Sequence, residues 1–168
     1  ESTKLTEVDR ELYGRLLDPD MDRREIVNGL QELTELLEKH YGRKVIVLID
    51  EYDVPVAKAN SHDYYGEMLD VMKGVMQALK DNQALQFAVI TGCLKIAKES
   101  IFTGTNNFVS DTITDSRLNE YFGFVQREVD QILKDADAIG YAESIRIWYD
   151  GYHFGDFDVY CPWDVMNY

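Results

Sequence analysis

A short apolar run that ends in two acidic residues is the feature that most constrains the fold of this chain. Residues 45–49 are Val, Ile, Val, Leu and Ile, and Asp50 and Glu51 follow directly. Five unbroken apolar residues rich in β-branched types are typical of a strand buried on both faces in a parallel α/β sheet. Open α/β sheets place their ligand crevice at the carboxyl ends of their strands. We therefore expect Asp50 and Glu51 at the rim of such a crevice.

An acidic pair at this position has two interpretations. Asp followed by Glu is typical of the Walker B strand of nucleotide hydrolases, in which the Asp holds Mg²⁺ and the Glu positions or deprotonates the attacking water. Carboxylates also end strands simply because they are soluble. The loop motif G-x-x-x-x-G-K-[ST], which holds the phosphates in such enzymes, does not occur in the 168 residues. Asp53 is a further candidate metal ligand, and Pro55 predicts a sharp turn out of the sheet.

Thr91 is the candidate partner of the acidic pair. It follows a second predicted strand, residues 85–90. In nucleotide hydrolases the strand beside Walker B supplies a polar sensor that hydrogen-bonds the attacking water or the γ-phosphate. A strand-terminal Thr is equally a good strand former with no catalytic role. Lys95, Lys98 and Arg117 follow, each either a cation that faces phosphates or a solvated surface charge.

The charge and cysteine content exclude several classes of protein. The chain has 31 Asp and Glu against 17 Lys and Arg, a net charge of −14. A surface this acidic repels phosphate backbones, so nucleic-acid binding by this segment is not expected. Cys93 and Cys161 are isolated, which supports neither a zinc site nor a disulfide framework and suits a reducing cytoplasm. No apolar run is long enough to cross a membrane, and we expect a cytoplasmic protein.

Apolar spacing predicts helices that alternate with two strands. Asp22, with Glu25 three residues on, predicts the start of a helix by a capping box, and Gly42 predicts its end. A helix between the strands at residues 45–50 and 85–90 predicts that these strands pair in parallel. Apolar residues three and four positions apart predict helices at residues 5–17, 22–42, 65–79 and 122–136.

The last third of the chain has a different composition. A short strand is expected near residues 111–114, and the aromatic, Gly-punctuated residues 148–155 predict a tight hairpin. Pro162 begins a further helix. The sequence thus predicts an α/β fold, with a parallel sheet under helical cover in residues 1–118 and a small, mostly helical subdomain with the hairpin in residues 119–168.

Four segments of the chain form a recognisable set of motifs. They are residues 39–55 (KHYGRKVIVLIDEYDVP), 91–102 (TGCLKIAKESIF), 119–124 (NEYFGF) and 148–154 (WYDGYHF). Together they resemble the AAA-ATPase-like family of predicted prokaryotic ATPases, whose order they follow, and they span nearly the whole chain.

The resemblance implies a partial P-loop NTPase core. Walker B falls on Asp50, which would hold Mg²⁺ through water, and on Glu51 as the catalytic base, while the sensor falls on Thr91. The resemblance also implies that the full-length protein takes ATP and Mg²⁺. It places a Walker A loop before residue 1 and a nuclease-like domain of the PD-(D/E)xK type after residue 168.

The missing Walker A region has two expected consequences. This chain alone is not expected to bind nucleotide. Removing the Walker A strand also leaves apolar strand edges unpaired. We therefore expect the chain either to pair with another copy or to pack its last strand against the sensor strand.

Three functional hypotheses follow. The first is the Walker B and sensor portion of an ATPase. The second is a non-catalytic regulatory or protein-interaction module that docks through the aromatic segment at residues 148–154. The third is a nuclease whose metal is bound by Asp50, Glu51 and Asp53, although no Lys follows at the spacing that a nuclease strand needs.

Overall fold

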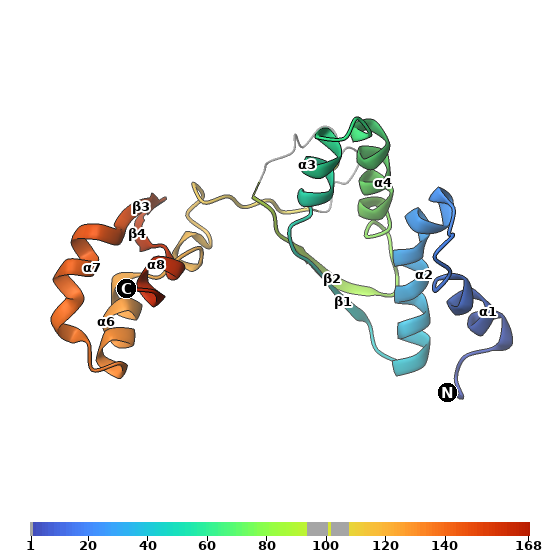
Figure 1. Cartoon of the computed structure of the whole chain (residues 1–168). Helices are drawn as coiled ribbons and strands as arrows, with labels where there is room; N and C mark the ends of the chain where they lie inside the picture. The colour runs from blue at the N-terminus through green and yellow to red at the C-terminus, as the bar shows by residue number, and fades with distance from the viewer. Residues whose placement is uncertain (1, 94–100, 102–107) are drawn as a thin grey trace. The chain divides into compact units, whose positions relative to one another are not determined.

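The computed structural model describes residues 2–93, 101 and 108–168. The chain divides into two compact units, Glu1–Asn107 and Phe108–Tyr168. The sequence predicts a boundary after residue 118, whereas residues 108–118 belong to the second unit in the structure. Each unit is described by itself (Figure 1).

Two parallel strands form the centre of the first unit. β1 (Val45–Ile49) pairs with β2 (Leu85–Ile90), and this confirms the predicted parallel pairing. The predicted helix between them is α4 (Tyr65–Gln77). A second helix, α3 (Val54–Asn60), lies directly after β1 and was not predicted. Pro55 stands in its first turn, where a missing N–H costs nothing.

The first two helices of this unit begin and end at local signals. α1 spans Glu7–Arg15 and α2 spans Arg23–Tyr41. At the start of α2, the backbone N–H of Glu25 donates to Asp22 and that of Asp22 donates to Glu25, both at 2.9 Å, which confirms the capping box. Gly42 ends the helix in the left-handed conformation, as predicted, with φ of 67°.

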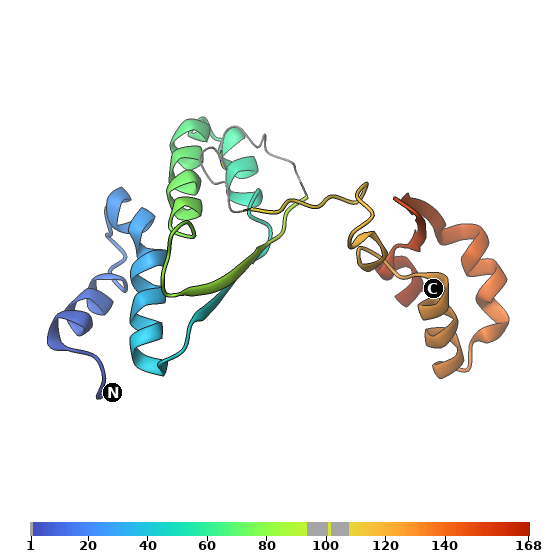
Figure 2. The same ribbon diagram turned by 180° about the vertical axis from the view of Figure 1, so that it is seen from behind.

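Among the described residues of the first unit, helices cover one face of the β1–β2 pair and leave the other exposed, so the expectation of a strand buried on both faces is wrong. Figures 1 and 2 show α2, α3 and α4 on the same side of the strands. Val47 faces that side and is buried, whereas Leu48 is 73% exposed. Ile46 lies beside Phe87, and Leu48 beside Val89, across the two strands. We call these four exposed apolar side chains the open sheet face: Ile46, Leu48, Phe87 and Val89.

The second unit packs short helices around a hairpin. Its core consists of buried apolar side chains from three helices and one strand: Val129, Leu133, Ile145, Tyr160 and Val165. The elements are the 3-10 turns η1 (Asn119–Tyr121) and η2 (Ile139–Tyr141), the helices α6 (Gln126–Asp135), α7 (Ala142–Tyr149) and α8 (Pro162–Met166), and the strands β3 (Asp150–Phe154) and β4 (Phe157–Tyr160).

The predictions for this unit have different outcomes. The helix predicted at residues 122–136 is confirmed as α6. A hairpin forms, but it spans residues 150–160 rather than 148–155, because Trp148 and Tyr149 end α7 and the second strand is β4. The helix from Pro162 is confirmed. The prediction of a strand near residues 111–114 is wrong. Asp115 accepts a 2.6 Å hydrogen bond from the backbone N–H of Thr112 and closes a turn there. β3 and β4 form a sheet of their own, separate from that of β1 and β2. The other expected outcome of the missing strand, pairing with another copy, stays a prediction.

The tip of the hairpin depends on a close approach between two residues. Gly155 has φ of 57°, and a Cβ atom there would overlap the side-chain amide of Asn119. Asn119 is buried, and its Nδ2 donates a 2.9 Å hydrogen bond to the carbonyl of Phe154. The glycine therefore allows both the turn and the hydrogen bond.

Gly155→Ala is expected to lower the free energy of unfolding of the second unit by about 1–3 kcal/mol. The alanine would have to adopt the left-handed backbone conformation, and its Cβ atom would displace the side chain of Asn119. Thermal unfolding measures the loss. Gly151→Ala in β3 is the matched control, since nothing lies within 4 Å of its added Cβ. Equal melting temperatures for the two variants would contradict this account.

A buried carboxylate joins α1 to α2. Asp9 is 6% exposed, and its Oδ2 accepts hydrogen bonds from the backbone N–H (3.0 Å) and the hydroxyl (2.8 Å) of Thr6. Its Oδ1 lies 2.6 Å from the Nζ of Lys39 on α2. These contacts, above all the one with Lys39, lower the pKa of Asp9 from 3.8 to about 2.

The stability of the first unit is therefore expected to depend on pH through Asp9. Because the folded pKa is depressed, the stabilisation is complete above pH 4 and is lost as the pH falls toward about 2. Asp9→Asn should remove this dependence, as measured by urea unfolding between pH 2 and pH 5. Glu11→Gln on the same helix is the control, and an unchanged pH dependence in Asp9→Asn would contradict the assignment.

Candidate functional site

The predicted acidic pair and the predicted sensor come together at the carboxyl end of the strand pair. Backbone pairing continues past the strands, because the N–H of Thr91 donates to Ile49 (2.9 Å) and the N–H of Tyr52 donates to Thr91 (3.0 Å). This pairing sets Thr91 beside Asp50. The Thr91 hydroxyl donates a hydrogen bond to Oδ1 of Asp50. Both side chains are exposed, so a ligand can reach them.

Glu51 takes an unusual backbone conformation for its residue type. Its φ is 54°, in the left-handed region that non-glycine residues rarely adopt. The carbonyl of Glu51 accepts a 3.0 Å hydrogen bond from the N–H of Val54, so the chain turns here from β1 into α3. The Glu51 side chain is exposed, as is that of Asp50. Strained non-glycine residues cluster at functional sites, and sequence patterns carry no signal for them.

Asp53 differs from the other two carboxylates. It is 3% exposed, and its Oδ1 accepts a 3.3 Å hydrogen bond from the backbone N–H of Cys93. Cys93 follows β2, so Asp53 connects the turn after β1 to the turn after β2. The sequence makes Asp53 a candidate metal ligand, and this role stays a prediction for a carboxylate that the structure shows buried and hydrogen-bonded.

No group of three His, Cys, Asp or Glu side chains is placed to hold a metal ion within the described part of the chain. The three carboxylates of the nuclease hypothesis are therefore not gathered into one cluster. Mg²⁺ in nucleotide hydrolases needs less, because one or two protein carboxylates suffice when phosphates and waters complete the shell. An exposed oxygen donor such as Asp50 fits that requirement.

Of the three candidate cations, the structure describes Arg117 only. Lys95 and Lys98 lie outside the described residues. Arg117 belongs to the second unit, and its Nε donates a 2.9 Å hydrogen bond to Asp111. The guanidinium is thus occupied by a carboxylate of its own unit.

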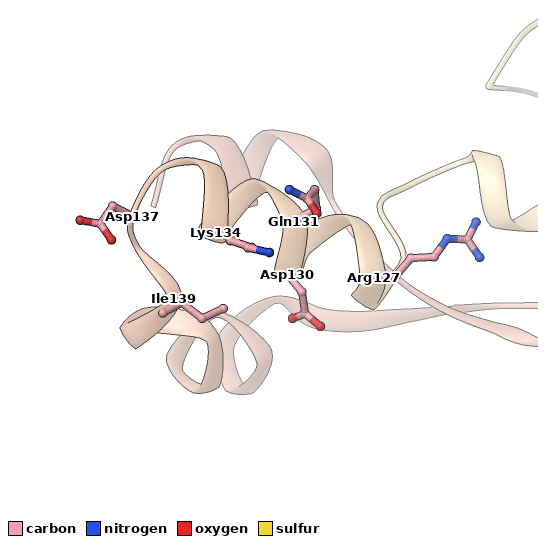
Figure 3. A pocket seen from close by; sticks show the side chains of 6 residues that line it. All are labelled: Arg127, Asp130, Gln131, Lys134, Asp137 and Ile139. Atoms are coloured by element: carbon pink, nitrogen blue, oxygen red, sulfur yellow. The ribbon is translucent and has the colours of Figure 1, made fainter.

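A groove in the second unit shares no residue with the acidic site. Figure 3 shows its side chains along α6 and the turn that follows. Positive and negative groups alternate on it, and Arg127 is paired with Glu120 outside the groove at 3.0 Å. This is an open surface of mixed charge, unlike the convergent donors that hold a nucleotide. Its lining residues are Arg127, Asp130, Gln131, Lys134, Asp137 and Ile139.

The chain is similar to a protein family and to a bacterial protein. The model of a family described as "Predicted AAA-ATPase" matches residues 3–102. A protein of Azotobacter chroococcum mcd 1, described as "Uncharacterized protein in vnfD 5'region", is 32% identical over 127 residues, which cover 74% of this chain and 24% of that protein. The chain thus spans about a quarter of the length of this relative. No solved structure matches the chain.

Across the residues that the structure describes, no helix combines the length and the apolar character needed to cross a bilayer.

The hydrogen bond between Thr91 and Asp50 is expected to contribute little to stability, because both groups are exposed to water. Thr91→Val should change the free energy of unfolding by no more than about 1 kcal/mol. Urea unfolding measures this, with Thr91→Ser as the control that keeps the hydroxyl. A loss of several kcal/mol would mean that the contact supports the fold rather than a ligand.

Proposed function

Because the chain belongs to the predicted AAA-ATPase family, we propose that Asp50, Glu51 and Thr91 are the Walker B and sensor residues of an ATP-hydrolysing site. The proposal covers the part of a P-loop NTPase core that begins at β1 and includes β2. The single observation that supports it most is the hydrogen bond from the Thr91 hydroxyl to Asp50 at the carboxyl edge of two adjacent parallel strands.

Each of the three residues has a distinct role in this proposal. Bound Mg²⁺ would neutralise charge that develops on the phosphates, and Asp50 would hold it through water. Glu51 would accept a proton from the attacking water as that oxygen bonds to the γ-phosphorus and the bond from phosphorus to the β–γ bridging oxygen breaks. Thr91 would orient Asp50 and, as the sensor, would hydrogen-bond the attacking water or the γ-phosphate.

The exposure of these groups supports the assignment. Asp50, Glu51 and Thr91 are all exposed at the strand ends, where α/β sheets bind ligands. The neighbouring carboxylate, Asp53, is buried and occupied by a backbone N–H. Two accessible carboxylates beside a hydroxyl are a donor set that suits Mg²⁺ and a water molecule.

ATP binding is a property that we assign to a longer polypeptide. The 168 residues contain no phosphate-binding loop motif, and they span about a quarter of the Azotobacter relative. In this proposal the loop and the nucleotide pocket are supplied by residues outside this sequence. The 168-residue chain alone is then expected to bind no nucleotide.

A protein-interaction module is the second candidate, and the exposed aromatic side chains of the second unit favour it. Trp148 is 76% exposed and Trp163 is 74% exposed. Exposed large aromatics are common in protein interfaces. In this alternative the acidic pair has no catalytic role.

The test compares two proteins. One is the 168-residue chain, and the other also contains the residues encoded upstream of Glu1. Labelled ATP with Mg²⁺ should bind to the extended protein only. In that protein Glu51→Gln should keep ATP binding and lower phosphate release about 10²-fold or more, because a general base contributes that much. Asp50→Asn should also raise the Mg²⁺ concentration that hydrolysis requires.

Asp63→Asn is the matched control for these variants, because it makes the same change of charge at an exposed position elsewhere in the first unit. Its rate should equal that of the unsubstituted protein. Failure of ATP to bind either protein would contradict the ATPase proposal and favour the interaction module. Unchanged phosphate release in Glu51→Gln would rule out its role as a base.

A further inference from the structure

The buried carboxylate of Asp53 lies between the two turns that carry the candidate catalytic groups. Asp53 belongs to the turn that leads from Glu51 into α3. Its Oδ1 accepts a hydrogen bond from the N–H of Cys93, which lies in the turn after β2. Burying a carboxylate is costly unless it is hydrogen-bonded, so a residue 3% exposed at this position has a structural or functional use.

Gly92 shows how tightly these two turns are packed. A Cβ atom on Gly92 would lie 2.5 Å from Cε1 of Tyr52 and 2.7 Å from Oδ1 of Asp53. Both distances are shorter than any normal contact. Residue 92 therefore has to be glycine for the Tyr52 ring and the Asp53 carboxylate to keep these positions.

The contacts form a continuous set around Thr91. Its N–H donates to Ile49 at 2.9 Å, and its carbonyl accepts from Tyr52 at 3.0 Å. Two residues further on, Cys93 is held by Asp53. The backbone on both sides of the Thr91 side chain is thereby fixed to the turn that carries Asp50 and Glu51.

We propose that Asp53 is a positioning residue, not a metal ligand, and that it sets the place of the Thr91 hydroxyl beside Asp50 by holding the backbone of residues 91–93. This role in catalysis rests on the proposed ATPase function. The geometric part, that Asp53 fixes the turn after β2, stands without it. Gly92 serves the same arrangement, because any larger residue would displace the carboxylate.

Amide hydrogen exchange of the 168-residue chain tests the geometric part. Asp53→Ala should speed exchange at the Cys93 and Thr91 amides about tenfold or more, because one hydrogen bond is lost and the turn loosens. Asp53→Asn keeps an oxygen acceptor at the same place and should restore most of the protection. Gly92→Ala should resemble Asp53→Ala, and Asp20→Ala, an exposed acid of the same unit, should change nothing at these amides.

Phosphate release by the extended protein tests the catalytic part. Asp53→Ala should lower kcat about tenfold or more, leave the KM for ATP within about twofold and leave the Mg²⁺ requirement unchanged. Asp53→Asn should recover most of the kcat. A positioning role predicts this recovery. If Asp53 were a metal ligand, both variants would lose its negative charge, and both would raise the Mg²⁺ requirement as Asp50→Asn does.

The outcomes separate the two proposals. If Asp53→Asn raises the Mg²⁺ requirement, or if Asp53→Ala leaves amide exchange at Thr91 and Cys93 unchanged, the positioning role is wrong. If the extended protein neither binds nor hydrolyses ATP, the ATPase function and the catalytic part of this inference fail together. The exchange measurement then still decides whether Asp53 holds the turn.

Discussion

The pairing of β1 with β2 is the contact on which the arrangement of the first unit depends. Its hydrogen bonds continue past the last strand residues, from Thr91 to Ile49 and from Tyr52 to Thr91. A parallel pair brings residues far apart in sequence to the same edge of the sheet. The acidic residues after β1 and the hydroxyl after β2 therefore lie at the same edge of the sheet. A shift of one residue in this pairing would turn the Thr91 side chain to the other face.

Three carboxylates within four residues illustrate how local environment divides one residue type among different tasks. Asp50 and Glu51 remain accessible to solvent, while Asp53 is covered by its own turn and by Gly92. An accessible carboxylate can exchange its water for a cation or a substrate. A covered one is held by a backbone amide and gives rigidity instead. The short turn after β1 thus combines groups that face a ligand with the group that supports them.

Local signals made much of the fold predictable from the sequence, and tertiary effects account for the rest. The capping box of Asp22 and the left-handed Gly42 depend on neighbouring residues, and the meeting of Asp50 with Thr91 follows from strand order. The helices α3 and α7 were missed because seven and eight residues are too few for a clear periodicity. The burial of Asp53 was missed because it depends on Gly92 and Cys93, forty residues away in the chain, and no local pattern encodes that approach.

The open sheet face gives the chain two opposed tendencies in solution. Four apolar side chains on adjacent strands attract other apolar surfaces, while a net charge of −14 repels further copies of the same chain. The repulsion acts over a Debye length and weakens as salt is added, but the attraction does not. Colloidal behaviour should therefore be governed by ionic strength, and the most dilute buffers should keep the molecule best dispersed.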